Sequence, residues 1–302
     1  MTNPILVTSA RRRMRSLRTI LIFTLYTAAL LGLSWQVLSR FGAKTIDLTS
    51  MRSGIDGYIM LVVMQFLLIV LVAPAMTSGA ISGERERQTL DLLLVTGTGS
   101  LRIALGKLLE SFLFLALLIV SSAPFLAVVL LGGGVSILDI AWSLLFLLTA
   151  AFAALSVGLF CSTLFKRAAT SAVAAYLMIF GIGVATLLPI ASGVSEAFQA
   201  YADDPSLTAS LTAASALALM PKVLFASPAI GLFSLLTSQT ELMRSTFRGY
   251  IPYGGTWYAL LEKLDFARVA HANMAVMLAA ALLLIALSAL LVRPRAIRRR
   301  KK

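Results

Sequence analysis

The sequence predicts an all-α, polytopic membrane protein with six transmembrane helices. Hydrophobic residues make up 59% of the 302 residues and charged residues only 13%. This composition is more apolar and less charged than that of a typical soluble domain. Six uncharged stretches are long enough for an α-helix to cross about 30 Å of hydrocarbon. They are residues 19–39, 57–83, 111–138, 140–165, 168–195 and 269–292. We therefore expect residues 1–302 to form a single transmembrane domain.

Lysine and arginine gather at both ends of the chain and beside particular spans, and this pattern predicts the orientation. Five arginines precede the first span, and residues 293–302, after the last span, include seven basic residues. Short cytoplasmic loops retain positive charge. With an even number of spans, both termini lie in the cytoplasm, as do the basic residues of 85–107 and the Lys166–Arg167 pair. We expect a multi-pass protein of the cell (inner) membrane.

The long segment 196–268 falls on the opposite side of the membrane. It contains two apolar runs, 206–221 and 223–240, which are short and interrupted by Pro221, Lys222 and Pro228. We expect two re-entrant helices that enter the outer leaflet and return before the last span, with their irregular turn shielded by protein. A crossing pair, which would give eight spans, remains an alternative on hydropathy grounds.

A dense block of charge, Glu84-Arg-Glu-Arg87, directly follows the second span. Hydrocarbon rejects these four side chains, so the chain must leave the bilayer near Gly83. The block therefore marks the point at which the chain meets water.

The residues after this block predict a short helix at the aqueous surface. Thr89 is a good N-cap, and Asp91 lies in the first turn, where the helix dipole favours a carboxylate. Leu90, Leu93 and Leu94 recur at positions i, i+3 and i+4 and form a narrow apolar stripe. Such a helix suits docking onto another protein. The alternative is an ordinary charged loop whose leucines touch the bilayer surface.

The polar residues argue against several other functions. The net charge of +13 would suit nucleic acid, but the basic residues flank apolar runs, so we expect membrane lipid and no nucleic acid as a partner. One cysteine and one histidine give no basis for a metal site. Residues 97–107 fail the phosphate-loop template, because Leu101 and Leu108 stand where it needs Gly and Ser or Thr. We expect this chain to bind no cofactor and to carry no catalytic residues.

Polar residues and prolines inside the spans are the remaining features to explain. Gln65 is the most central polar residue and is our candidate for lining a substrate path. His271 and Asn273 lie near a span end, where interfacial water accounts for them. Pro74 and Pro124 are expected to kink their helices.

The stretch Ile81-Ser-Gly-Glu-Arg-Glu-Arg-Gln-Thr-Leu-Asp-Leu-Leu-Leu94, followed by Gly106-Lys-Leu-Leu109, resembles the membrane subunit of type-2 ABC exporters. The likeness covers the six-span layout, with sharp motif identity over about residues 78–110. It implies a permease half that dimerises, with itself or with a related chain. It also implies two separate ATP-binding subunits, which would hold ATP and Mg. By this likeness 84–96 is the coupling helix received by the ATPase, and 206–240 forms the re-entrant helices.

The resemblance also implies which residues couple the chain to the ATPase. They are Glu84, Arg85, Glu86, Arg87, Thr89, Leu90, Asp91, Leu93, Leu94, Lys166 and Arg167. The last two match the family's short loop between the fourth and fifth spans. The family often has Gly where Gln88 stands, and Pro soon after the leucines, where this chain has Gly97-Thr-Gly99. These departures leave open how the chain leaves the coupling helix.

The spans and the resemblance together predict an exporter permease that works by alternating access. An integral membrane enzyme acting on lipid is one alternative, but no intramembrane carboxylate cluster or paired nucleophile and base supports it. An ion-coupled secondary transporter is the other, but it would normally show charged residues within spans and an internal repeat. We therefore expect ATP hydrolysis in a partner chain.

Overall fold

The computed structural model describes residues 17–41, 48–89, 100–131, 135–203, 227–240 and 266–292. Within these ranges all the regular structure is helical, which confirms the all-α class. The helices are α2 (Leu17–Phe41), α3 (Leu48–Thr77), α4 (Ser82–Glu86), α6 (Ser100–Ser121), α7 (Ala123–Leu131), α8 (Ile137–Leu164), α9 (Ala168–Asp203), α11 (Pro228–Gln239) and α14 (Phe266–Leu291).

Five stretches of the described chain are long and apolar enough to cross a membrane. They are Gly54–Glu86, Arg102–Ala127, Ile137–Leu164, Ala168–Thr186 and Phe266–Leu291. These stretches overlap the second to sixth predicted spans, although their limits differ by about ten residues in the third and the fifth. Helix α2 covers the first predicted span, 19–39, and its 25 residues extend about 38 Å. It is not among the five, so a sixth span stays a prediction.

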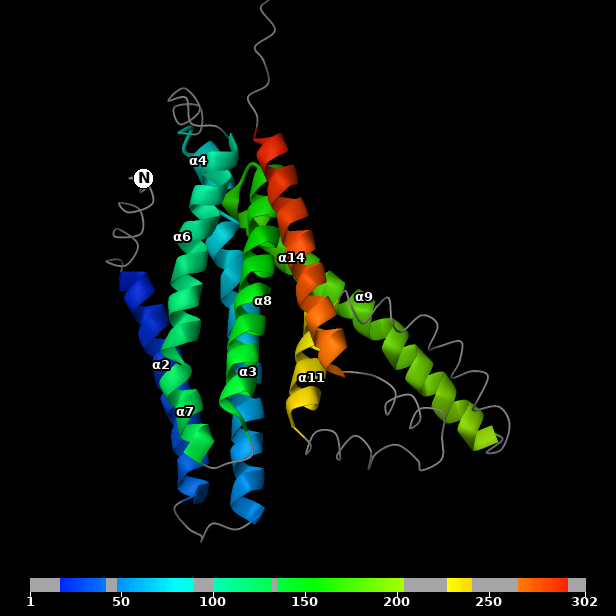
Figure 1. Ribbon diagram of the computed structural model, residues 1–302. Helices are drawn as coiled ribbons and strands as arrows, with labels where there is room; N and C mark the ends of the chain where they lie inside the picture. Colours follow the sequence, from blue (N-terminus) through cyan, green and yellow to red (C-terminus); the bar gives the residue numbers. More distant parts are fainter. Residues whose placement is uncertain are drawn as a thin grey trace, which may run out of the picture.

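Helix α8 is the central helix of the bundle, and α3, α6, α9 and α14 pack against it (Figure 1). A capping box fixes its start: Leu138 N–H donates to Ser136 Oγ, and Ser136 N–H donates to the Asp139 carboxylate at 2.9 Å. The largest hydrophobic cluster gathers around α8 and α3. It includes the fully buried side chains of Leu30, Tyr58, Leu61, Phe146 and Leu147.

The third predicted span, 111–138, is divided into two helices, α6 and α7, which meet at Ser122. Pro124 has no N–H to continue the helical hydrogen bonding. The N–H groups of Phe125 and Leu126 instead donate to the Ser122 carbonyl, at 3.0 and 3.1 Å. The helix is therefore interrupted at Ser122, beside the expected kink at Pro124. At Pro74, in contrast, α3 continues as one helix.

Several helices extend past the limits of the predicted spans. Helix α3 begins at Leu48 rather than near residue 57, α6 begins at Ser100, and α9 runs to Asp203. Hydropathy marks only the part of a helix that lies in hydrocarbon, whereas the backbone hydrogen bonds continue into the polar interface. The predicted spans therefore locate the helices but underestimate their lengths.

Helix α11 lies toward the end of the bundle opposite α4, where it packs against α14 and also touches α8 (Figure 1). It starts with Pro228 at its first position, and its 12 residues extend only about 18 Å. This is too short to cross about 30 Å of hydrocarbon. The apolar run 223–240 therefore does not supply a crossing helix in its described part, and the run 206–221 lies outside the described residues.

The start of α2, the end of α14, the α8–α9 turn and α4 all lie at the same end of the bundle (Figure 1). We call this the α4 end, and the opposite end the α11 end. An even number of crossings requires this arrangement of the first and last spans.

Candidate functional site at the α4 end

The chain leaves α3 at Thr77, turns through Ser78–Ile81 and enters the five-residue helix α4. A short helix exposes backbone N–H groups at its start, and no side chain of its own caps them here. Ser162 on α8 supplies the cap instead, since its Oγ accepts from Ile81 N–H at 2.8 Å and from Ser82 N–H at 2.9 Å. Both Ser82 and Ser162 are fully buried. Helix α4 is therefore anchored to the central helix from its first residue, just before the charge block.

Glu84 connects α4 to α6. Its carboxylate forms an ion pair with Lys107 Nζ at 3.1 Å and also accepts a hydrogen bond from the Thr89 hydroxyl. The two charged side chains are 25% and 37% exposed for Glu84 and Lys107, so solvent screens the pair and its contribution to stability is under about 1 kcal/mol. Its main effect is to fix the position of α4 relative to α6.

Arg85 and Glu86 connect α4 to two further helices. Arg85 Nη1 donates to the Thr163 carbonyl at 2.8 Å, one of the last carbonyls of α8. Glu86 Oε2 accepts from Ala168 N–H, the first residue of α9, at 3.3 Å. A cation at a helix C-terminus and an anion at an N-terminus both match the helix dipole. Three consecutive charged residues thus reach three different helices.

The end of α4 differs from the predicted coupling helix. Helix α4 ends at Glu86, and Gln88 has a φ of 57°, in the left-handed region. The predicted helix over 84–96 is therefore not continuous, because the left-handed residue Gln88 interrupts it. Any further helix in this segment begins after Gln88. Thr89 bonds back to Glu84, while Leu90, Asp91, Leu93 and Leu94 lie outside the described residues.

The structure brings the two predicted groups of site residues together. Lys166 and Arg167 are exposed in the turn that directly precedes Ala168, the residue bonded to Glu86. Sequence reasoning missed Ser162 and Thr163 as partners of the charge block. A signal existed, because both are polar residues at the end of an apolar span, but it did not indicate which residues they would contact.

A close crossing of α3 and α8 positions α4. The Thr77 hydroxyl on α3 donates to the Leu155 carbonyl on α8 at 2.8 Å. At Gly158 a Cβ atom would lie 3.0 Å from the Pro74 carbonyl oxygen and would collide with the Thr77 hydroxyl. Glycine is needed here because the backbone of α3 occupies the space that a side chain would fill.

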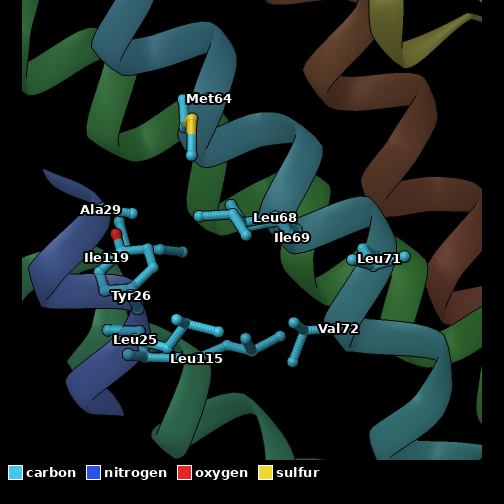
Figure 2. Close-up of a pocket in the computed structure, with 11 residues that line it drawn as sticks. Leu25, Tyr26, Ala29, Met64, Leu68, Ile69, Leu71, Val72, Leu115 and Ile119 are labelled. Atoms are coloured by element: carbon cyan, nitrogen blue, oxygen red, sulfur yellow. The ribbon is translucent and has the colours of Figure 1, made fainter. Parts of the chain in front are cut away.

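Gln65, the candidate for the substrate path, lies in the core of the bundle. Its side chain is 0% exposed, and neither amide atom has a hydrogen-bond partner among the described residues. A cavity of about 280 Å³ lies nearby between α2, α3 and α6, lined by residues that include Tyr26, Met64, Leu68 and Ile119 (Figure 2). Gln65 is not part of that lining.

The two other polar span residues lie differently from one another. Asn273 was expected to face interfacial water, but it is 0% exposed, and its Nδ2 donates to the Ser227 carbonyl at 2.9 Å. The expectation was wrong because α11 covers this face of α14. His271 is exposed, and its ring meets Trp142 edge to face with centroids 4.4 Å apart.

Comparison with known proteins places this bundle in a family. The family described as "ABC-2 family transporter protein" matches residues 36–290, which extend from α2 to α14. The chain belongs to this family. It is a multi-pass membrane protein and the transport subunit, or permease, of an ABC transporter, in which an ATP-binding subunit is its partner. No curated protein matches the chain.

Proposed function

We propose that the chain is an exporter permease that dimerises, with itself or a related chain, and binds two ATPase subunits at its α4 end. The observation that supports this best is the set of contacts made by Glu84, Arg85 and Glu86 to α6, α8 and α9. A force applied to α4 would act on three helices at once. ATP and Mg belong to the partner subunits, and this chain binds no cofactor.

Alternating access follows from this arrangement if the ATPase holds α4 in two positions. ATP-driven closure of the ATPase pair would displace α4, and the connected ends of α6, α8 and α9 would move with it. Packed helices shift between discrete arrangements rather than deform continuously, so a small displacement switches the bundle between two states. ATP biases the equilibrium only to the extent that the ATPase binds one state more tightly.

The membrane topology completes the proposal. We infer six spans, with α2 as the first, and a cytoplasmic α4 end in the cell (inner) membrane, because basic residues gather at that end. The coupling segment comprises α4 and the residues up to 96. Residues 206–240 form the re-entrant element, and the short α11 supports this arrangement over a crossing pair. Gln65, buried without a partner among the described residues, remains the candidate residue on the substrate path.

Site-directed cross-linking tests which end of the bundle receives the ATPase. A cysteine would replace the exposed Arg87 in a Cys161→Ala background, and the complex with the co-purifying ATPase subunit would be treated with a thiol-to-amine cross-linker. The matched control is Ile137→Cys. The native Ile137 side chain is 74% exposed and lies at the α11 end. We expect a permease–ATPase product from Arg87→Cys alone. A product only from the control, or none from either position, would contradict the proposed docking site.

A further inference from the structure

A closed chain of hydrogen bonds joins three helices at the α11 end. Tyr58 on α3 lies with its hydroxyl 2.5 Å from Ser143 Oγ on α8 and 2.8 Å from Gln239 Oε1 on α11. Gln239 Nε2 then donates to the Asp139 carbonyl on α8 at 3.0 Å. One proton order satisfies every group: Ser143 donates to Tyr58, Tyr58 donates to Gln239, and Gln239 donates to Asp139.

One end of this network is buried, whereas Gln239 and Asp139 are partly exposed. Tyr58 and Ser143 are both 0% exposed, and the residues around them belong to the main hydrophobic cluster. The Tyr58 hydroxyl also lies 3.1 Å from the Asp139 carbonyl. If Gln239 moved away, Tyr58 would donate to that carbonyl instead, so α3 and α8 would stay linked while α11 lost its bonds to both. The network therefore has two satisfied arrangements, one that includes Gln239 and one that does not, and only the first holds the end of α11.

Helix α11 is held at both of its ends, but by different helices. At its start, Asn273 on α14 donates to the Ser227 carbonyl at 2.9 Å. At its last residue, Gln239 bonds to α3 and α8. Between these points, Ile230, Leu232 and Leu236 are buried against the bundle. Loss of the Gln239 contacts would free one end of α11 while the other remained fixed to α14.

Helix α3 links this network to the candidate coupling site. Tyr58 lies near its α11 end, and Thr77, its last residue, directly precedes the turn into α4. The helix between these two residues extends about 29 Å without interruption. If α3 moved as one body with α4, the Tyr58 hydroxyl would change its position relative to Gln239.

We propose that Tyr58 and Gln239 form a latch that holds α11 against α3 and α8, closes the α11 end of the transport path, and opens when α4 moves. Release of the latch by movement of α4 rests on the proposed function, whereas closure by Tyr58 and Gln239 does not. Tyr58 and Gln239 act as positioning residues, because they hold a helix in place and need not touch the substrate.

The test measures how fast a water-soluble thiol reagent reaches the buried face of α11. A cysteine would replace Ser234, which is 2% exposed, in a Cys161→Ala background, and its labelling by a charged thiol reagent would be timed in lipid nanodiscs. Nanodiscs expose both membrane faces, so the result does not depend on orientation. Tyr58→Phe, which keeps the ring and removes the hydroxyl, should raise the labelling rate roughly tenfold.

Two further variants separate a latch from general loosening. Gln239→Leu should raise the rate at least as much as Tyr58→Phe does, because it also removes the bond to Asp139. The double variant should be no faster than Gln239→Leu, because Tyr58→Phe then removes no further bond to α11. Tyr176→Phe is the matched control: it removes the hydroxyl that donates to the Leu71 carbonyl between α9 and α3, and should leave the rate unchanged. An unchanged rate in Tyr58→Phe, or an equal increase in Tyr176→Phe, overturns the latch.

Addition of ATP to the complex with its ATPase subunit tests the link to α4. In the protein with an intact latch, ATP should raise the labelling rate at Ser234→Cys, and in Tyr58→Phe it should add little. If Tyr58→Phe accelerates labelling but ATP has no effect in either protein, the closure by Tyr58 stands and its release through α4 is wrong. If ATP acts equally in both proteins, release does not pass through Tyr58.

Discussion

The side chain of Asn273 on α14 lies directly against the backbone of Gly231 on α11. A Cβ atom at Gly231 would lie 3.1 Å from the Asn273 Cβ atom and would overlap its amide group. The same amide donates a hydrogen bond to the Ser227 carbonyl, so Asn273 cannot move aside without breaking that bond. The docking of α11 therefore depends on the absence of a side chain at one position.

Gly231→Ala is expected to destabilise the docking of α11 by about 1–3 kcal/mol, the usual cost of adding a methyl group to a filled site. The midpoint of thermal unfolding in detergent measures this loss. Gly32→Ala is the control, because nothing lies within 4 Å of a Cβ atom at Gly32 in helix α2, and alanine is the better helix former by roughly 0.5–1 kcal/mol. Equal midpoints for the two variants would contradict the close packing of Gly231.

Gly158→Ala should force α3 and α8 apart beside α4. The added methyl group meets the Pro74 backbone and the Thr77 hydroxyl, which is held in place by its bond to the Leu155 carbonyl. We expect a loss of about 1–3 kcal/mol in unfolding free energy together with weaker coupling of ATP hydrolysis to the permease. Gly106→Ala on α6, where a Cβ atom meets nothing within 4 Å, should leave both properties close to wild type.

Gln88→Gly should be neutral or stabilising, by up to about 1 kcal/mol, because a non-glycine residue in the left-handed region bears a steric cost that glycine avoids. Gln88→Val should be destabilising, since a β-branched side chain tolerates this conformation least. Thermal unfolding and recovery of the complex with the ATPase measure both variants. A more stable valine variant would show that this turn is not left-handed in the membrane.

Replacement of both Glu84 and Glu86 by alanine should leave membrane insertion intact but weaken assembly with the ATPase or uncouple hydrolysis from transport. The double change removes the links of α4 to Lys107 and to the start of α9. Pull-down of the ATPase subunit and its hydrolysis rate in the complex provide the measurements. Asp56→Ala, an exposed acidic residue near the α11 end of α3, is the control. Full coupling in the double variant would show that these contacts are dispensable.

The sequence predicted the elements that hydrocarbon dictates. Charge-free runs of spanning length located five helices that meet the length and hydropathy requirements, because a bilayer leaves few alternatives to a helix. The exit of the chain from the bilayer near Gly83, which follows from the exclusion of charged side chains from hydrocarbon, stays a prediction. The interruption at Ser122, beside Pro124, was foreseen only as a kink, because a local pattern does not indicate whether neighbouring helices support a continuous turn.

The contacts of the candidate site could not be predicted from local sequence patterns. Ser162, Thr163 and Ala168 lie about 80 residues from the charge block, and only tertiary packing brings them to it. Asn273 was assigned to interfacial water for the same reason, because its burial depends on α11. The one local clue that the structure explains is Gln88: the position where the family often has Gly has left-handed backbone geometry.

The contacts made by residues 81–86 have a consequence for engineering. Their backbone and charged groups are already bonded to α6, α8 and α9, whereas Arg87, in the turn after α4, is exposed. A chimaera intended to accept a foreign motor subunit should therefore keep residues 81–86 and exchange the segment that begins at Arg87. The boundary between the segment to keep and the segment to exchange therefore falls between Glu86 and Arg87, two adjacent charged residues.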